Sequence, residues 1–151
     1  MKRTPLAIHE RCYIVQNMAG LVPDRGDPST VSTLAAIQYA VCELGVRHAI
    51  VCGHLACRFL PKMKKDTSFV RPGGAGGNQN EAARFAGPLQ RELLKSAVGQ
   101  HVRQQLASLK SLKFVRERLR AGKLRFHAWL LDDDAGQLHS FNATNGHFDP
   151  L

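Results

Sequence analysis

The sequence lacks any long apolar run, and none of its stretches approaches the roughly 18 apolar residues that a membrane-spanning helix needs. Residues 1–8 are basic but contain no extended apolar core, so they do not have the pattern of a signal peptide. A cytoplasmic or organelle-interior location is therefore the default expectation. The length of 151 residues and a hydrophobic content of 44% predict one globular domain that covers residues 1–151.

Acidic and aromatic residues are also scarce. Only 12 Asp and Glu stand against 21 Lys and Arg, which gives a formal net charge of +9. Such a charge would attract an acidic partner or a nucleic acid at low salt, although a basic solvated surface is the favoured interpretation. The few aromatic residues, 7% of the chain, are not interleaved with the basic ones, as they are in proteins that stack single strands. Nucleic acid is therefore not the favoured partner.

The four cysteines are unevenly spaced, at Cys12, Cys42, Cys52 and Cys57. In a compartment without disulfides such cysteines are core residues or metal ligands rather than bridges. We expect Cys12 in a strand and Cys42 on a helix to be core residues. We also assign Cys52 to the core, on the opposite side of its strand from His54.

The first half of the chain has the pattern of a strand, a helix and a second strand. Residues 12–15 form a short apolar run, and residues 46–51 form another. Between them, apolar residues recur at helical spacing from Val31 to Leu44, with Ser29 as a plausible N-cap and Gly45 placed to end the helix. This order predicts a βαβ unit and a parallel sheet.

The second half predicts a long helix followed by two strands. From about residue 81 to residue 121 an apolar stripe recurs at three- and four-residue spacing. A strand over residues 124–131, a turn at residues 134–136 and a returning strand over residues 137–142 follow. The glycine-rich residues 73–77 do not fit a dinucleotide-binding fingerprint, and we expect a loop of unassigned role over residues 62–80. The stripe consists of Val98, Val102, Leu106, Leu109, Leu112, Val115 and Leu119.

His54 and Cys57 are the strongest candidates for chemistry. They lie three residues apart, directly after the apolar run at residues 49–51. Imidazole nitrogen and thiolate sulfur are ligand types that zinc favours. Two ligands do not complete a tetrahedral site, however, and no obvious third ligand lies upstream. We treat His101, His139 and His147 as surface or satisfied histidines.

Five segments, in the same order along the chain, resemble motifs of the β-class carbonic anhydrases. Residues 48–57, His-Ala-Ile-Val-Cys-Gly-His-Leu-Ala-Cys, are similar to the family's His-Ile-Val-Val-Cys-Gly-His-Ser-x-Cys. Residues 122–129, Gly-Lys-Leu-Arg-Phe-His-Ala-Trp, resemble its Gly-Lys-Leu-x-Leu-His-Gly-Trp. The other three segments are residues 14–23, 35–41 and 146–151.

The resemblance implies an α/β fold with a mainly parallel sheet flanked by helices, assembled as dimers or multiples of dimers. It also implies bound zinc and the reversible hydration of carbon dioxide to bicarbonate, with His54 and Cys57 as zinc ligands. In such a site zinc lowers the pKa of its bound water to about 7, so that hydroxide attacks carbon dioxide.

The departures from the family pattern lie around this site. The family's Cys-x-Asp-x-Arg motif occurs nowhere in this sequence. In the family this motif supplies the third zinc ligand, an aspartate beside the zinc-bound water and an arginine that holds the aspartate. We therefore expect the fold to lack the family's N-terminal helices and first central strand, leaving strand edges that another chain pairs or that close up. Gln16 replaces an arginine, and Arg58 follows Cys57 where the family has a small residue. Possible site-lining residues are Gly53, Arg58, Asn17 and Gln16.

Two hypotheses of different classes follow. In the first, the chain is a carbonic anhydrase subunit or fragment whose zinc site is completed by another polypeptide or by a missing segment. In the second, it is a non-catalytic pseudoenzyme that keeps the dimer-forming fold and holds an acidic partner. The basic residues between Arg103 and Lys123, with Lys62, Lys64 and Lys65, would form that surface. Under both hypotheses we expect little or no activity from the isolated chain.

Overall fold

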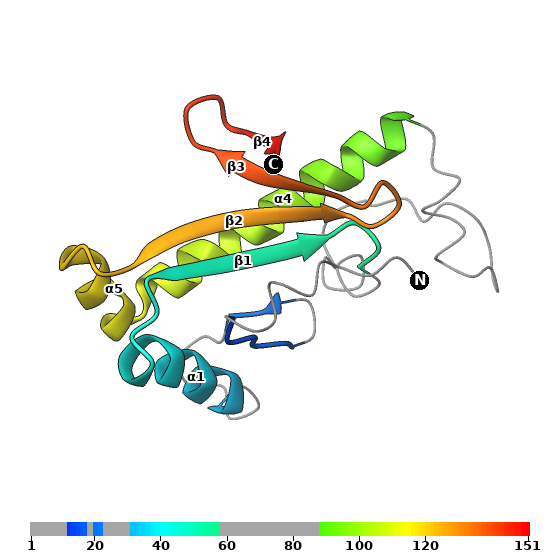
Figure 1. Ribbon diagram of the computed structural model, residues 1–151. Coiled ribbons are helices and arrows are strands. Elements are labelled where there is room, and N and C mark those ends of the chain that lie inside the picture. The colour runs from blue at the N-terminus through cyan, green and yellow to red at the C-terminus, as the bar shows by residue number, and fades with distance from the viewer. Residues whose placement is uncertain (1–11, 18–19, 23–30, 58–87) are drawn as a thin grey trace.

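The computed structural model describes residues 12–17, 20–22, 31–57 and 88–151. Figure 1 shows α4 packed along one face of the sheet and α1 beyond the β1 edge. None of the helices within these ranges is long and apolar enough to cross a membrane. In chain order the elements are α1 (Val31–Gln38), the π-helical turn η4 (Tyr39–Glu43), β1 (His48–His54), α4 (Pro88–Ser111), α5 (Lys113–Arg120), β2 (Arg125–Asp132), β3 (Gln137–Asn142) and β4 (His147–Pro150).

The described sheet has the order β1-β2-β3-β4. β1 and β2 are parallel, in a register that runs from His48 opposite Arg125 to His54 opposite Leu131. β3 and β4 are added as antiparallel strands. The α/β fold with a parallel strand pair is thus confirmed, but the parallel crossover is the unit β1–α4–α5–β2 and not the predicted βαβ unit over residues 12–51. β4 was not predicted as a strand.

The strand predicted over residues 12–15 is wrong. These residues are in no described strand, and Tyr13 and Ile14 are 47% and 56% exposed. An apolar run becomes a strand only where a neighbour accepts its backbone hydrogen bonds, and in the described sheet β1 pairs with β2 alone. Cys12 is consequently exposed rather than a core residue.

The helix predicted to end at Gly45 is confirmed, but its last turn is wider than expected. Residues 39–43 form the π-helical turn η4, and Gly45 follows with φ +62°. In this wider turn Val41 is buried while Cys42 faces solvent. The prediction that Cys42 lies on the buried face is therefore wrong.

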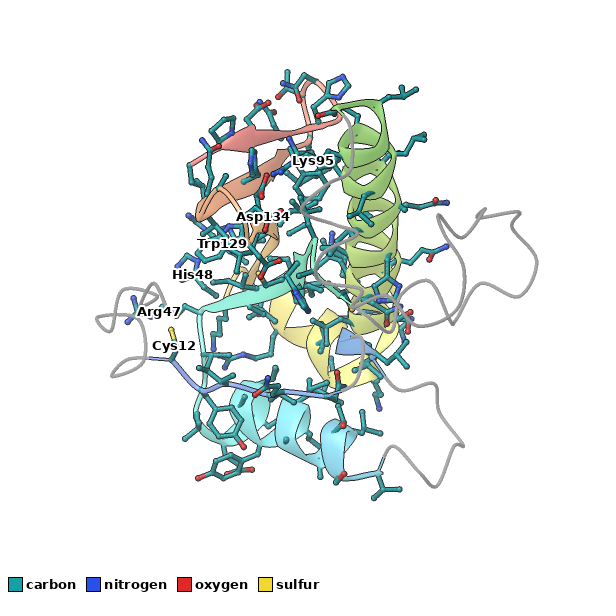
Figure 2. All side chains as sticks on the ribbon, turned by 90° about the vertical axis from the view of Figure 1, so that its right-hand side faces the viewer. Cys12, Arg47, His48, Lys95, Trp129 and Asp134 are labelled. Carbon is teal, nitrogen blue, oxygen red and sulfur yellow. The ribbon has the colours of Figure 1, made fainter. Side chains whose placement is uncertain are left out.

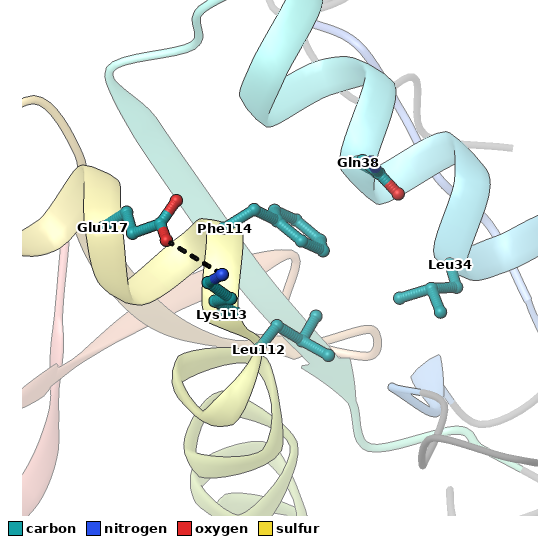
Figure 3. Close-up of a pocket in the computed structure, with 6 residues that line it drawn as sticks. All are labelled: Leu34, Gln38, Leu112, Lys113, Phe114 and Glu117. Atoms are coloured by element: carbon teal, nitrogen blue, oxygen red, sulfur yellow. Dashed lines mark ion pairs between the residues drawn. The ribbon is translucent and has the colours of Figure 1, made fainter.

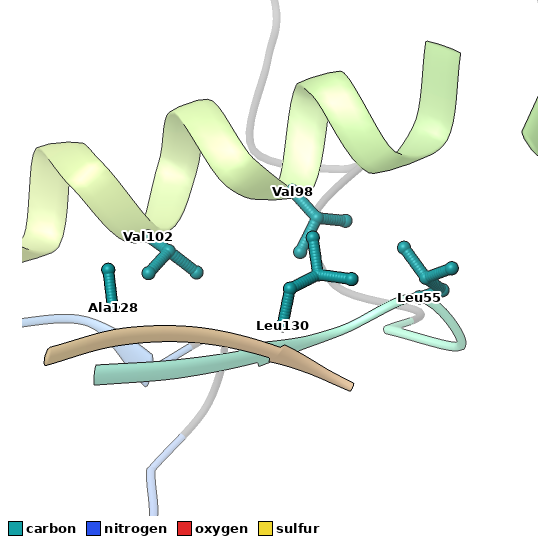
Figure 4. Close-up of a cluster of buried hydrophobic side chains, with 5 residues drawn as sticks. All are labelled: Leu55, Val98, Val102, Ala128 and Leu130. Atoms are coloured by element: carbon teal, nitrogen blue, oxygen red, sulfur yellow. The ribbon is translucent and has the colours of Figure 1, made fainter. Parts of the chain in front are cut away.

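A first core cluster joins α4 to β1 and β2 (Figure 4). Val98 and Val102, four residues apart on α4, have no more than 1% of their surface exposed, and they pack on Ala128 and Leu130 of β2. Leu55, just after β1, completes the cluster. Full burial of such side chains contributes about 1.5–3 kcal/mol each, so the predicted apolar stripe is what attaches the helix to the sheet.

A second core cluster explains why the predicted long helix is two helices. Leu112, with ψ 133°, separates α4 from α5 and is 3% exposed. The break directs α5 back over the amino ends of the strands, where Gly122 ends it with φ +66°. The buried members of this cluster are Val41, Leu109, Leu112, Val115 and Leu124.

Gly53 is the point of closest approach between β1 and α4. A Cβ atom at this position would lie 2.6 Å from Val102 Cγ2 and 2.7 Å from Val98 Cγ1. We expect Gly53→Ala to lower the free energy of unfolding by about 1–3 kcal/mol, because α4 would have to move away from the sheet. Urea unfolding measures this effect. In a double-mutant cycle, Gly53→Ala combined with Val102→Ala should lose less stability than the sum of the two single-mutant losses. Simple additivity would contradict the close contact.

A partly buried ion pair fixes the amino-terminal part of α4 to the end of β2. Arg91 Nη2 donates to both carboxylate oxygens of Asp132, at 2.7 and 2.8 Å, and Ala135 N donates to Oδ1 at 3.1 Å. Asp132 is only 4% exposed. Burial acts to raise the pKa of Asp132, but the hydrogen bonds from Arg91 and Ala135 and the charge of Arg91 outweigh it, so the pKa lies below its ordinary value.

Removal of Arg91 should lower the free energy of unfolding more at neutral pH than in acid. Because folding lowers the pKa of Asp132, the ionised carboxylate adds its full contribution to the free energy of unfolding above its unfolded pKa of about 3.9. This contribution is lost as the pH falls through the folded pKa. Arg91→Met should therefore cost about 1–3 kcal/mol at pH 7, with a smaller deficit in acid. Urea unfolding at several pH values tests this. Lys113→Met is the control, since its pair with Glu117 is exposed; an equal loss there would contradict the assignment.

Candidate metal centre

His54 and Cys57 lie at the two ends of one tight turn at the carboxyl end of β1. Cys57 N donates to His54 O at 3.3 Å, which closes the turn. Leu55 N donates to Leu131 O at 3.0 Å, and the buried Leu55 side chain anchors the turn to the core. The His54 side chain is 49% exposed and Cys57 is half-buried. The two predicted ligands are thus brought to the same edge of the sheet.

Asp133, which the sequence analysis missed, lies beside this turn. Its Oδ2 accepts a hydrogen bond from Ala56 N at 2.8 Å and is 3.5 Å from His54 Nδ1. Asp133 directly follows β2, and the carboxyl ends of parallel β1 and β2 meet at one edge. A carboxylate just after the strand predicted over residues 124–131 was the available signal.

The described side chains do not form a complete zinc site. His54 and Cys57 are of the type that zinc binds, but among the described residues no group of three or more His, Cys, Asp or Glu side chains is placed to hold a metal ion. A stable tetrahedral site requires at least three protein ligands. Among the described residues, the donor set at the end of β1 therefore fits zinc in kind but does not reach three ligands.

Cys52 lies on the same face of β1 as His54, because side chains two positions apart in a strand share a face. It is exposed, as the alternating burial of β1 requires. The expectation of a core residue on the opposite side was therefore wrong. Partial desolvation of the thiol, together with the negative charge of Asp133, raises the pKa of Cys52, so the thiol stays protonated near neutral pH.

In the described part of the chain, no side-chain contact joins the other predicted site-lining residues to His54 or Cys57. Asn17 Nδ2 donates to Leu21 O at 2.6 Å, and Gln16 is exposed. Gly53 faces α4 rather than the His54 side of the sheet. Arg58 and the three lysines Lys62, Lys64 and Lys65 lie outside the described residues. A role for these residues at the site stays a prediction.

Histidines also lie away from the predicted ligands His54 and Cys57. His48 Nδ1 is 2.9 Å from His127 Nε2, and the two rings are stacked. Figure 2 shows His48 and Trp129 on the side of the sheet away from α4. His139 is buried, with no hydrogen-bond partner at Nε2 in the described structure, so the expectation of a surface or satisfied histidine was wrong there.

In the part of the chain that the structure describes, two cavities lie elsewhere, and neither is lined by His54 or Cys57. The first, about 390 Å³, lies between α1 and α5 and contains the Lys113–Glu117 ion pair at 4.0 Å (Figure 3). The second, about 540 Å³, lies at the amino ends of β1 and β2. Its lining residues are Gly45, Arg47, His48, Arg118, Gly122, Lys123 and Arg125.

Comparison with known sequences places these features in a family. Residues 9–138 match the family model of carbonic anhydrase. The chain is 27% identical over 145 residues to a carbonic anhydrase of Pseudomonas aeruginosa, covering 90% of this chain and 64% of that protein. It is 28% identical over 150 residues to carbonic anhydrase 1 of Escherichia coli O157:H7, covering 91% and 65%. The chain thus spans just under two thirds of the length of these relatives.

Solved structures show the same fold. The β-carbonic anhydrase CcaA superposes with a TM-score of 0.69 at 20% identity, covering 99% of this chain and 78% of that chain. The Coccomyxa β-carbonic anhydrase in complex with acetazolamide gives a TM-score of 0.63 at 18% identity, covering 91% and 66%. From the family match and this shared architecture, the chain belongs to the carbonic anhydrase family and has the fold of its β class.

Proposed function

We propose that this chain is a β-carbonic-anhydrase-type subunit with a partial zinc site and little or no carbon dioxide hydration activity in isolation. The observation that supports this proposal is the donor set at the carboxyl end of β1. His54 and Cys57 supply two ligands of the right type, and no third is placed beside them among the described residues. A two-ligand site binds zinc weakly and exchanges it.

Among the described residues, no aspartate–arginine pair lies where it could position a zinc-bound water beside His54. Arg91 and Asp132 are an arginine–aspartate pair near the same edge, but Asp132 points to the α4 face. His54 is opposite Leu131 in the register, so its side chain lies on the other face from Asp132. Loss of both a ligand and the orienting groups costs orders of magnitude in rate.

Asp133 has a supporting role in this proposal. Its carboxylate holds the turn through Ala56 N and lies within reach of His54 Nδ1. An imidazole whose Nδ1–H faces a carboxylate presents its Nε2 to a metal, and such partners fix the orientation of metal-binding histidines. Asp133 would thus orient His54 rather than bind the metal itself.

The missing ligand would come from a polypeptide added along β1. β1 has one neighbour in the described sheet, so the backbone groups of its other edge are available to pair with a further strand. A strand added there would bring a side chain to the carboxyl end of β1, beside His54. The relatives from Sordaria macrospora are tetrameric, which supports a homo-oligomer here.

The second candidate function is a non-catalytic binding module that holds an acidic partner. The net charge of +9 and the exposed basic side chains of α5, such as Arg116 and Arg120, favour this alternative. It shares the family fold with the first proposal but requires no metal. Metal content therefore separates the two candidates.

Zinc content and activity should be measured on one sample of the purified chain. We expect well under one zinc per chain after dialysis against a weak chelator, and carbon dioxide hydration no faster than the buffer in stopped flow. The physical reason is the two-ligand donor set. Stoichiometric zinc with activity would overturn the proposal and would place further ligands outside the described residues. Complete absence of metal binding would favour the acidic-partner module.

Cobalt(II) substitution tests the individual ligands. Cys57→Ser should remove the sulfur-to-cobalt charge-transfer absorption, whereas the neighbouring control Cys52→Ser should retain it. Asp133→Asn should weaken cobalt binding by about ten- to a hundredfold, as loss of a histidine-orienting group does. Equal effects of the two cysteine substitutions would contradict the assigned ligands.

A further inference from the structure

The basic cavity at the amino ends of β1 and β2 is separate from the metal residues. His48 begins β1 and His54 ends it, so the cavity lies roughly 20 Å along the strand from the His54 turn, at about 3.3 Å per residue. Arg47 and His48 mark this end of β1 in Figure 2. No sequence motif singled out the cavity, because its residues come from three places in the chain.

The fold gathers cations here through two turns. Gly45 and Gly122, with φ +62° and +66°, end η4 and α5 and lead the chain towards β1 and β2. Arg125 N then donates to Arg47 O at 2.8 Å, which sets the starts of the two strands side by side. The positions around these turns are occupied by Arg47, Lys123 and Arg125, and Arg118 reaches in from α5.

Within residues 12–17, 20–22, 31–57 and 88–151, no acidic side chain balances these charges. The cavity lining contains three arginines and one lysine but no Asp or Glu, and none of the four forms an ion pair with a described residue. Arg118 Nη2 donates to Val46 O at 3.3 Å, while its buried Nε has no partner in the described structure. The cations therefore repel one another, and a bound anion would relieve that repulsion.

We propose that this cavity binds phosphate, as the free ion or as the phosphate group of a small ester. Arginine forks match the oxygens of phosphate, and several of them suit a dianion better than a singly charged carboxylate. Recognition would come from side chains, because the amides of Val46, Gly122 and Lys123 already donate within the chain. The volume of about 540 Å³ leaves space beyond one phosphate ion, which favours a phosphate ester.

The probes are inorganic phosphate, adenosine 5′-monophosphate and adenosine, titrated into the full chain at low salt and followed by amide NMR. We expect saturable shifts at Gly122, Lys123 and Arg125 with both phosphates and none with adenosine. Tighter binding of the monophosphate than of phosphate would identify an ester as the ligand class. Equal affinity would identify free phosphate, and either result supports the proposal.

Charge substitutions test whether the cavity itself is the site. Arg125→Gln and Lys123→Gln alter exposed side chains, and each should weaken phosphate binding by about tenfold or more. Arg116→Gln removes the same charge from an exposed position of α5 outside the cavity and should change the affinity less than about twofold. Circular dichroism confirms that each variant is folded.

Three results would overturn the proposal. The first is the absence of saturable phosphate binding at low salt. The second is an equal loss of affinity in Arg116→Gln, which would indicate attraction to the net charge alone. The third is tight binding of poly-aspartate without phosphate binding, which would assign the surface to an acidic protein. These outcomes do not depend on zinc content or on activity, so this proposal and the proposed function fail separately.

Discussion

The contact of α4 with the parallel pair β1–β2 is the constraint on which the rest of the structure depends. Val98 and Val102 close over Gly53, where a single methyl group would not fit. This close approach holds β1 and β2 in register, and the register brings the two carboxyl ends together. The His54–Cys57 turn therefore lies beside Asp133, because the two residues follow strand ends that are paired in register.

The two ends of the parallel pair have opposite electrostatic character. At the carboxyl ends, Asp132, Asp133 and Asp134 follow one another, and two of them accept from Arg91. At the amino ends, Arg47 and Arg125 lie in a cavity without a described counter-charge. A basic chain of net charge +9 thus places three acidic residues near the predicted metal ligands, and at the opposite end it places cations without a described counter-charge, where an anion would suit them.

The edge of β1 connects the fold to the proposed chemistry. In the described sheet β1 has one neighbour, so the backbone groups along its other side need partners, and β1 ends at His54. Pairing along this edge and completion of the metal site would therefore be one event. Activity would then depend on assembly, as expected where a family fold keeps two ligands and the third comes from elsewhere.

The sequence by itself determined the family, the apolar stripe of α4 and α5, the glycines that end helices, and the strands β1, β2 and β3. These features depend on neighbours a few residues apart, so periodicity and motif order record them. The tertiary structure alone decided that residues 12–15 form no strand, that Leu112 breaks a helix, that Asp133 lies beside His54 and that four cations line one cavity. Each of these depends on partners distant in the chain, and strand pairing and charge clustering follow from packing rather than from local sequence.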